Sequence, residues 1–312
     1  MANFYLAFEV IFPLLAYIMI GFAAARMNLW DEDTALTMNK MVFSIFMPAL
    51  LFENVRIIDL AAGINYSLIL YGTVSTLITF IVLCTLIPRL EKEDSRRGVM
   101  IQGIFRSNFI LFGLAVARSL WGQEELGDTA ILIAVMIPLF NVLAVLALEI
   151  FRGGKVYWPR ILRNLVTNPL IISSLLGLAV LYSGIRLPAF ITTTTSNLGK
   201  VATPLALAAL GGCFRFEAVK SCLRPLVITV AARLVIMPVI WLTIAVFLGF
   251  RGLALISLLP FYGAPTAVAS YTMAQQMEGD CELAGQIVVY TSILSIFTIF
   301  GFIVIFKSLA LF

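Results

Sequence analysis

Three polar residues, Arg106, Ser107 and Asn108, interrupt the apolar stretch 98–122 close to its middle. A charged side chain near the centre of a bilayer costs at least about 3 kcal/mol, so it normally faces a partner, a water-filled cavity or a substrate path. Guanidinium groups bind carboxylates through two parallel hydrogen bonds. The triplet therefore predicts a binding site for an organic anion. Two alternatives stay open: Arg106 neutralises a glutamate, or it snorkels to the membrane surface from a span placed one turn away.

A second group of helix-breaking residues lies in the apolar stretch 252–276. Pro260, Gly263 and Pro265 stand near its centre. Proline removes a helical hydrogen bond and clashes with the preceding turn, and glycine lowers helix stability, so we expect a break at this point. A proline kink packed against neighbouring helices is the alternative. The residues expected at this break and at the binding site are Tyr262, Gly263, Pro265 and Thr266.

Other residues inside apolar stretches carry a charge or break a helix. Lys200 lies about halfway along residues 190–214 and is a further candidate contact for an anion, with exposure to water or structural pairing as the alternative. Arg233 lies some two turns from a predicted span end, so we expect it to snorkel. The further predicted helix breaks are Pro48, Pro204 and Gly113, with a purely structural kink as the alternative at the two prolines.

Composition indicates a membrane protein. Hydrophobic residues make up 61% of the 312 residues and charged residues 12%, and the mean hydropathy is +1.03. An ordinary soluble domain has roughly twice that charge. There is no histidine, and the four cysteines fall at no metal-ligand or redox spacing. These absences argue against nucleophilic enzymes, metal sites and cofactors, and no basic run suggests nucleic-acid binding.

The apolar stretches predict an all-α polytopic protein with ten membrane spans, at about 20 residues per crossing. Short connections leave no room for a soluble domain, so residues 1–312 form a single transmembrane domain. The predicted spans are roughly 4–25, 35–53, 65–87, 98–120, 128–151, 165–183, 190–214, 226–248, 252–276 and 284–307.

The basic residues predict how these spans are oriented. Twelve Lys and Arg residues fall in connections or at span ends on one side and five on the other. The richer side is the cytoplasmic one by the positive-inside rule, which places both termini outside. We therefore expect a multi-pass protein of a bacterial-type inner membrane, with periplasmic termini.

The two halves of the chain share landmarks at a nearly constant offset. Pairs 156 residues apart are Pro13 with Pro169, Gly21 with Gly177, and Pro48 with Pro204; pairs 154 apart are Arg97 with Arg251, Gly98 with Gly252, Ala115 with Ala269, and Asp128 with Glu282. These pairs predict two five-span repeats, residues 1–151 and 164–312. Five is an odd number, so the second copy must enter the membrane from the opposite face.

An inverted repeat is typical of secondary transporters, which hold their substrate near the midplane between broken helices. The fourth and ninth spans are equivalent in the two repeats, and they carry the triplet and the proline-rich break. We therefore expect these two broken spans to cross and to form the site together. A coupling ion, H⁺ or Na⁺, is a further expected partner. Hydroxyls and carbonyls of the broken spans could hold Na⁺, whereas the spans carry no deep Asp or His relay for H⁺.

Three stretches resemble the auxin efflux carrier family, which includes plant auxin carriers and bacterial malonate or malate carriers. They are NKMVFSIFMPALLF at residues 39–52, SNFILFGLAVARSLWG at residues 107–122, and GAPTAVASYTMAQQ at residues 263–276. The resemblance implies a ten-span inverted-repeat fold, crossing at the breaks of spans 4 and 9, an elevator-like movement and often a homodimer. It also implies that Asn108 is the crossover asparagine that contacts substrate. Ala115 departs from the plant pattern, in which a proline commonly stands there.

The sequence thus predicts a secondary carrier, or permease, of small organic anions, mono- or dicarboxylates, embedded in a lipid bilayer. Arg106 would attract the carboxylate, and Asn108, Ser107 and Thr266 would donate hydrogen bonds to it. An anion channel, or an exporter of other small hydrophobic molecules, is the alternative.

Overall fold

The computed structural model describes residues 2–58, 65–110, 112–113, 127–153, 156–215 and 217–311. This part of the chain is helical apart from short turns and one isolated bridge between Ser107 and Thr266. The second half of the predicted fourth span, from residue 114 on and including Ala115, lies outside the described residues.

Helical segments fall within each of the ten predicted span ranges. Their bounds are α1 Ala2–Arg26, α2 Glu32–Met41, η1 Val42–Phe46, α3 Met47–Arg56, α4 Tyr66–Leu90, α5 Asp94–Phe105, α7 Gly127–Ile150, α8 Trp158–Thr167, α9 Pro169–Ser183, α10 Ala189–Cys213, α11 Ala218–Ser221, α12 Leu223–Ala231, η3 Ala232–Ile236, α13 Met237–Phe247, α14 Gly252–Gly263, α15 Ala269–Gln276 and α16 Cys281–Ser308. The segments η1 and η3 are single π-helical turns inside longer helices.

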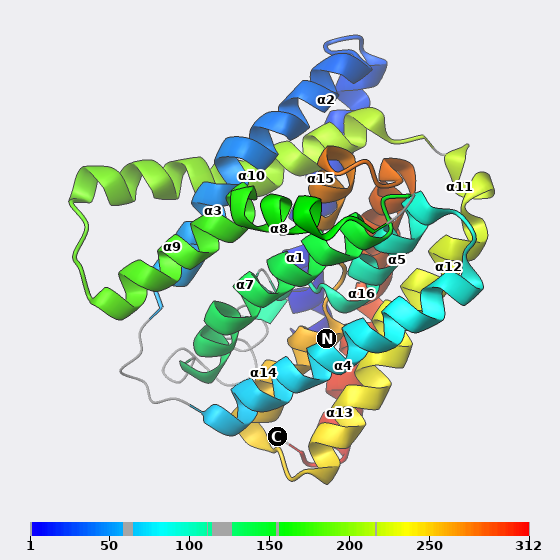
Figure 1. Cartoon of the computed structure of the whole chain (residues 1–312). Helices are drawn as coiled ribbons and strands as arrows, with labels where there is room; N and C mark the ends of the chain where they lie inside the picture. The colour runs from blue at the N-terminus through cyan, green and yellow to red at the C-terminus, as the bar shows by residue number, and fades with distance from the viewer. Residues whose placement is uncertain are drawn as a thin grey trace.

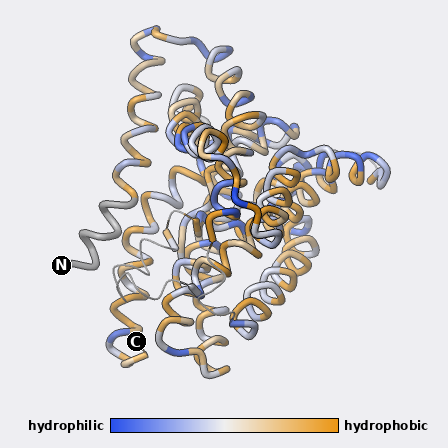
Figure 2. The backbone as a smooth tube through the Cα atoms, turned by 90° about the vertical axis from the view of Figure 1, so that its left-hand side faces the viewer, coloured by the Kyte–Doolittle hydropathy of each residue, from blue (hydrophilic) through white to orange (hydrophobic). Residues whose placement is uncertain are grey.

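Five helices of the described chain are long and apolar enough to cross a membrane, which makes this a polytopic membrane protein. They are Glu32–Arg56, Tyr66–Leu90, Gly127–Ile150, Leu223–Phe247 and Cys281–Ser308. The pair α8 and α9 is bent by 52° and makes a sixth if it is one span. Figure 2 shows apolar residues along the helices and hydrophilic ones gathered at many of the turns. The count of ten spans stays a prediction.

The helices pack as two groups (Figure 1). In the first bundle, α1, α2–α3, α9 and α10 lie against one another. In the second bundle, α5 packs against α4, α7, α12 and α16, α14 packs against α13, α16 and α7, and α15 packs against α16, α5 and α7. Contacts of α1 with α16, and of α7 with α3 and α9, join the two bundles.

The two halves of the chain have matching helix lengths. Glu32–Arg56 and Ala189–Cys213 begin and end 157 residues apart, as do Tyr66–Leu90 and Leu223–Phe247. The short helices α5 and α14 are offset by 158 residues at both ends. The offset of 154 suggested by the sequence for these two helices is therefore wrong by about one turn.

Two glycines mark close helix contacts in equivalent places. A Cβ atom on Gly21 would collide with the backbone carbonyl of Ala208 in α10, and one on Gly177 would lie 2.9 Å from the carbonyl oxygen of Phe52 in α3. Gly21 and Gly177 are 156 residues apart, and so are Phe52 and Ala208. A twofold relation between the halves would produce this reciprocal pairing.

Three of the predicted helix breaks are absent. Pro48 follows the π-turn η1 without interruption of the helix, and α10 continues through Pro204. The wider hydrogen bonding of a π-turn relieves the clash between a proline ring and the preceding turn, so Pro48 is accommodated. Gly113 is helical and sits against the ring of Phe109, so it is not the break either. Pro265 does lie in a break, between α14 and α15.

Candidate functional site

The broken ends of α5 and α14 meet at the centre of the molecule. The backbone leaves each helix in an extended conformation, at Arg106 after α5 and at Ala264 after α14. The two segments then run antiparallel: the amide of Asn108 donates to the Pro265 carbonyl at 2.7 Å, and the amide of Ala267 donates to the Arg106 carbonyl at 3.1 Å. The breaks that the sequence predicts in residues 98–122 and 252–276 are thus hydrogen-bonded to each other.

Thr266 connects the crossing, formed by residues 106–108 and 265–267, to neighbouring helices. Its hydroxyl donates to the carbonyl of Gly103 at 2.7 Å, and its amide donates to the hydroxyl of Thr291 in α16 at 3.2 Å. The side chain is 1% exposed. Thr266 is therefore committed to the backbone of the crossing and does not line the cavity beside it.

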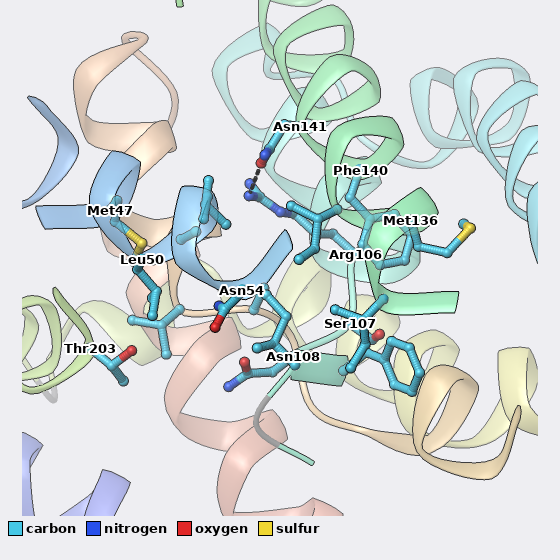
Figure 3. Close-up of a pocket in the computed structure, with 18 residues that line it drawn as sticks. Met47, Leu50, Asn54, Arg106, Ser107, Asn108, Met136, Phe140, Asn141 and Thr203 are labelled. Carbon is cyan, nitrogen blue, oxygen red and sulfur yellow. Dashed lines mark hydrogen bonds between the residues drawn. The ribbon is translucent and has the colours of Figure 1, made fainter. Parts of the chain in front are cut away.

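A cavity of about 100 Å³ opens between the two bundles beside the crossing. Its polar lining comes from the triplet, from α3, from α7 and from α10, as Figure 3 shows. The polar lining residues are Asn54, Arg106, Ser107, Asn108, Asn141 and Thr203. The remaining lining is apolar and includes Met47, Leu50, Met136, Ile137 and Phe140.

Arg106 is buried beside this cavity, and no carboxylate of the described residues pairs with it. Its side chain is 3% exposed, and Nη2 donates to Oδ1 of Asn141 at 2.6 Å (Figure 3). Asn141 in turn donates to the carbonyl of Leu170 at 3.4 Å, which orients its oxygen toward the guanidinium. Among the described residues, no Asp or Glu lies within ion-pairing distance of Arg106. No glutamate of the described chain therefore neutralises Arg106, and its burial rules out snorkelling.

Three further polar atoms of the cavity lining lack a partner among the described residues. They are the hydroxyl of Ser107 and the side-chain amide nitrogens of Asn108 and Asn54. A buried polar group without a partner costs about 1–3 kcal/mol. All three can donate a hydrogen bond, so a ligand that accepts several hydrogen bonds would satisfy them together with Arg106.

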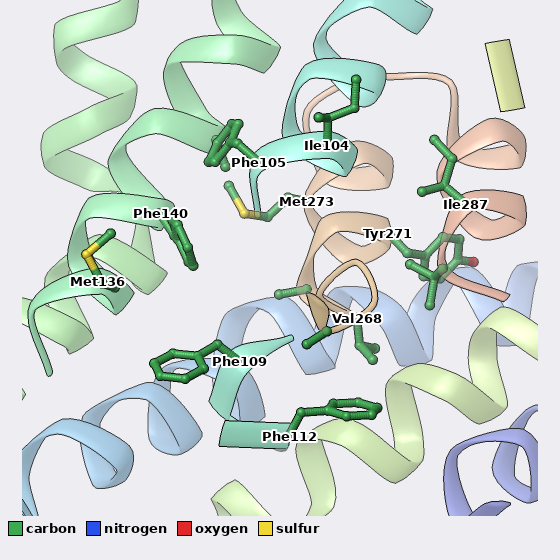
Figure 4. Packing of buried hydrophobic residues seen from close by; sticks show 14 of the residues in the cluster. Ile104, Phe105, Phe109, Phe112, Met136, Phe140, Val268, Tyr271, Met273 and Ile287 are labelled. Atoms are coloured by element: carbon green, nitrogen blue, oxygen red, sulfur yellow. The ribbon is translucent and has the colours of Figure 1, made fainter. Parts of the chain in front are cut away.

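Aromatic and sulfur-containing side chains enclose the crossing (Figure 4). The rings of Phe140 and Phe261 stack at 5.7 Å, and Phe109 meets Phe261 edge-on at 5.2 Å. Met273 contacts the guanidinium of Arg106 from α15. Apolar surroundings screen charge poorly, so an ionic contact to Arg106 would be stronger here than in water.

Arg233 lies on the other side of the crossing and does not snorkel as predicted. The side chain is 1% exposed and donates to backbone carbonyls at the ends of both α5 and α14. Sequence alone could not reveal this, because the carbonyls that hold Arg233 come from segments far away in the chain.

The other predicted site residues lie outside the cavity. The Tyr262 hydroxyl is hydrogen-bonded to that of Ser75, and Gly263 ends α14. Pro265 contributes only its carbonyl to the bridge with Asn108. Lys200 is exposed and borders a separate hollow between α3 and α10, which shares Asn54 with the cavity.

Sequence reasoning missed Asn54, Asn141 and Thr203. It weighed charges and helix breakers, whereas these three side chains are neutral. Asn141 offered a signal, because it is a lone carboxamide in the middle of the apolar stretch 127–150. No group of three or more Cys, Asp or Glu side chains that could bind a metal occurs within the described ranges.

Ion pairs join loops that the positive-inside rule places on one side. Arg96 pairs with Asp280 at 2.9 Å, and Arg152 pairs with Glu278. Arg152 holds the pKa of the Glu278 carboxyl below its usual range. Arg215 also pairs with Glu32, at 2.5 Å. The first two pairs join the loop after α15 to the first turn of α5 and to the loop after α7, and the third joins the start of α2 to the loop after α10. Which face of a membrane they occupy stays a prediction.

Comparison with known proteins decides the family. A family model described as a membrane transport protein matches residues 6–303, nearly the whole chain. The protein belongs to the auxin efflux carrier family. It is therefore a membrane transport protein and not an enzyme.

Curated members of this family match over almost their full length at low identity. An uncharacterized transporter of Methanothermobacter thermautotrophicus is 25% identical over 92% of this chain and 94% of its own. One of Methanocaldococcus jannaschii is 22% identical, over 93% and 96%. A Rhizobium meliloti protein named "Putative malonate transporter" is 22% identical, over 97% and 96%.

Proposed function

We propose that this auxin efflux carrier family member is a secondary carrier of small organic anions, mono- or dicarboxylates. The observation that carries the proposal is Arg106, a buried guanidinium that lines the cavity and has no carboxylate partner among the described residues. A buried charge of this kind is costly unless it is paired. A substrate carboxylate would supply the missing charge. The name of the Rhizobium meliloti relative is in keeping with such a substrate.

The arrangement of donors supports an anion. Ser107 and Asn108 extend from the same break as Arg106, and Asn54 faces them from α3 (Figure 3). Each has a donor atom without a partner in the described chain. A carboxylate has two oxygens with about four acceptor positions, so one carboxylate could accept from Arg106 and from these neighbours.

The position of the cavity supports alternating access. Its lining comes from α3 and α10 of the first bundle and from the triplet, α7 and α15 of the second. Sliding of one bundle along the other would carry the crossing and its ligand across the membrane, in the manner of an elevator. The same proposal includes ten spans in two inverted repeats, with both termini outside a bacterial-type inner membrane. It also includes a coupling ion and a homodimer. The matching helix bounds and the glycine contacts support the repeat.

Transport in proteoliposomes tests this function. Purified protein is reconstituted and given labelled malonate, malate or an aromatic monocarboxylate, under an imposed membrane potential, proton gradient or sodium gradient. We expect saturable uptake of at least one anion, accelerated when unlabelled substrate is loaded inside. Lys200→Gln, outside the cavity, serves as the control and should transport normally. Single-channel currents, or uptake confined to neutral or cationic compounds, would overturn the proposal.

A further inference from the structure

The guanidinium of Arg233 holds the ends of two helices at once. Nε donates to the Ala264 carbonyl at 2.8 Å and Nη2 to that of Phe261 at 3.2 Å, both at the end of α14. Nη1 donates to the carbonyls of Ile104 and Phe105, at 3.0 and 3.4 Å, at the end of α5. All three nitrogens of this guanidinium are thus engaged by backbone oxygens.

These carbonyls need a positive charge nearby. The last carbonyls of a helix have no partner within the helix, and the end carries roughly half a negative charge. Here two such ends, of α5 and α14, converge inside an apolar interior, where their repulsion is weakly screened. In membrane carriers, half-helix ends and unwound carbonyls of this kind coordinate coupling cations such as Na⁺.

Arg233 differs from Arg106 in every respect that matters for a ligand. Arg106 lines the cavity, and its guanidinium donates to side-chain atoms, the Asn141 amide oxygen and the Met273 sulfur. Arg233 does not border the cavity and is 1% exposed, and within the described chain its guanidinium donates only to backbone carbonyls. It projects from the π-turn η3, a local distortion that is frequent at functional positions.

We propose that Arg233 is a resident cation that joins the two broken helices and occupies the position where a carrier would otherwise bind a metal cation. The crossing is then assembled without sodium, and the Arg233 position provides no coupling site for Na⁺. Arg233 is a positioning residue, because it acts on the backbone that presents Arg106, Ser107 and Asn108. This inference concerns the empty carrier and does not depend on which substrate it carries.

Thermal unfolding of the purified protein in detergent, without substrate, tests the inference. For the wild type we expect the same Tm in sodium, potassium and N-methylglucamine chloride at equal ionic strength. We expect Arg233→Ala to lower the Tm by about 5 °C or more. Millimolar guanidinium or methylguanidinium, far below denaturing concentrations, should restore part of that loss. Arg233→Lys keeps the charge and three donors, so its Tm should lie between those of the wild type and Arg233→Ala.

Arg251→Ala is the matched control. Arg251 also donates to two backbone carbonyls, of Val246 and Phe250, but it is exposed. Guanidinium should not raise the Tm of this variant. A wild-type Tm that rises specifically with Na⁺ would overturn the inference, and so would an Arg233→Ala protein with the wild-type Tm or one that guanidinium does not stabilise. If Arg233→Ala does not fold, the Tm of the wild type in the three salts and the Tm of Arg233→Lys still test the inference. The assay does not measure transport, so failure of this inference can be distinguished from failure of the proposed function.

Discussion

Ser107 and Thr266 face each other in an isolated antiparallel bridge that joins the breaks of two helices from different halves of the chain. The bridge leaves Ser107 on the cavity side and commits Thr266 to backbone contacts. The two residues, both predicted to bind substrate, therefore have different surroundings.

Thr266→Val tests the structural role of this threonine. The substitution keeps the shape but removes the hydroxyl that donates to the Gly103 carbonyl. We expect the protein to lose about 1–2 kcal/mol of stability, because that carbonyl is left without this donor. A thermal unfolding measurement should show the loss, with Thr266→Ser close to the wild type. Equal stability of Thr266→Val and wild type would refute the role.

Asn141→Asp should weaken anion binding while it stabilises the protein. An aspartate at this position would place a carboxylate against the Arg106 guanidinium, where the amide oxygen now lies at 2.6 Å. The internal ion pair would compete with a substrate carboxylate, so we expect at least a tenfold loss of affinity, or about 1.4 kcal/mol. Asn141→Ala adds no charge, so it should lose less affinity for the anion. Unchanged anion affinity in Asn141→Asp would contradict the account.

Movement of the two bundles can be tested by cross-linking. Asn39 in α2 donates to Gln275 in α15, across the bundles, whereas Asn65 and Asp128 are hydrogen-bonded within the second bundle. In a chain with its four cysteines replaced by serine, paired cysteines at 39 and 275 should stop transport on oxidation and restore it on reduction. Paired cysteines at 65 and 128 should leave transport intact. Undiminished transport in the oxidised 39–275 protein would argue against relative movement at this interface.

Gly21→Ala should destabilise the first bundle. The new Cβ would collide with the Ala208 carbonyl, a backbone atom that cannot turn aside. Overpacking of this kind costs about 1–3 kcal/mol. Gly301→Ala is the matched control, since a Cβ there meets nothing within 4 Å. A comparison of thermal stability that finds the two variants equal would contradict the close contact of α1 and α10.

Sequence reasoning located the crossing because its signals are local. A charged residue inside an apolar stretch, and prolines with a glycine in another, are visible without knowledge of the fold. The face that a helix turns toward a cavity is not visible in this way, which explains why Lys200 was assigned to the site and Asn141 was not. The role of Arg233 depends on carbonyls at residues 104–105 and 261–264, so only the packed structure reveals it.

The repeat was also only partly visible. Identical residues at fixed offsets indicated two related halves, but in so apolar a chain such matches do not fix the register to within a turn. The helix bounds supply the better offset of 158 for α5 and α14. Proline alone did not predict a helix break correctly at Pro48 or Pro204. A π-turn precedes Pro48 without ending the helix, and α10 continues through Pro204.

Anion binding by Arg106→Gln, compared with the wild type, tests the central claim most directly. Binding of the labelled anion that the wild type carries is measured on purified protein by equilibrium titration, with thermal unfolding of the same samples. Glutamine keeps polar donors but removes the charge, so we expect affinity to fall at least about a hundredfold, or about 2.7 kcal/mol. We also expect a Tm equal to or above that of the wild type, because the substitution removes a buried charge that no carboxylate of the described residues pairs with. Wild-type affinity in a folded Arg106→Gln protein would contradict the account.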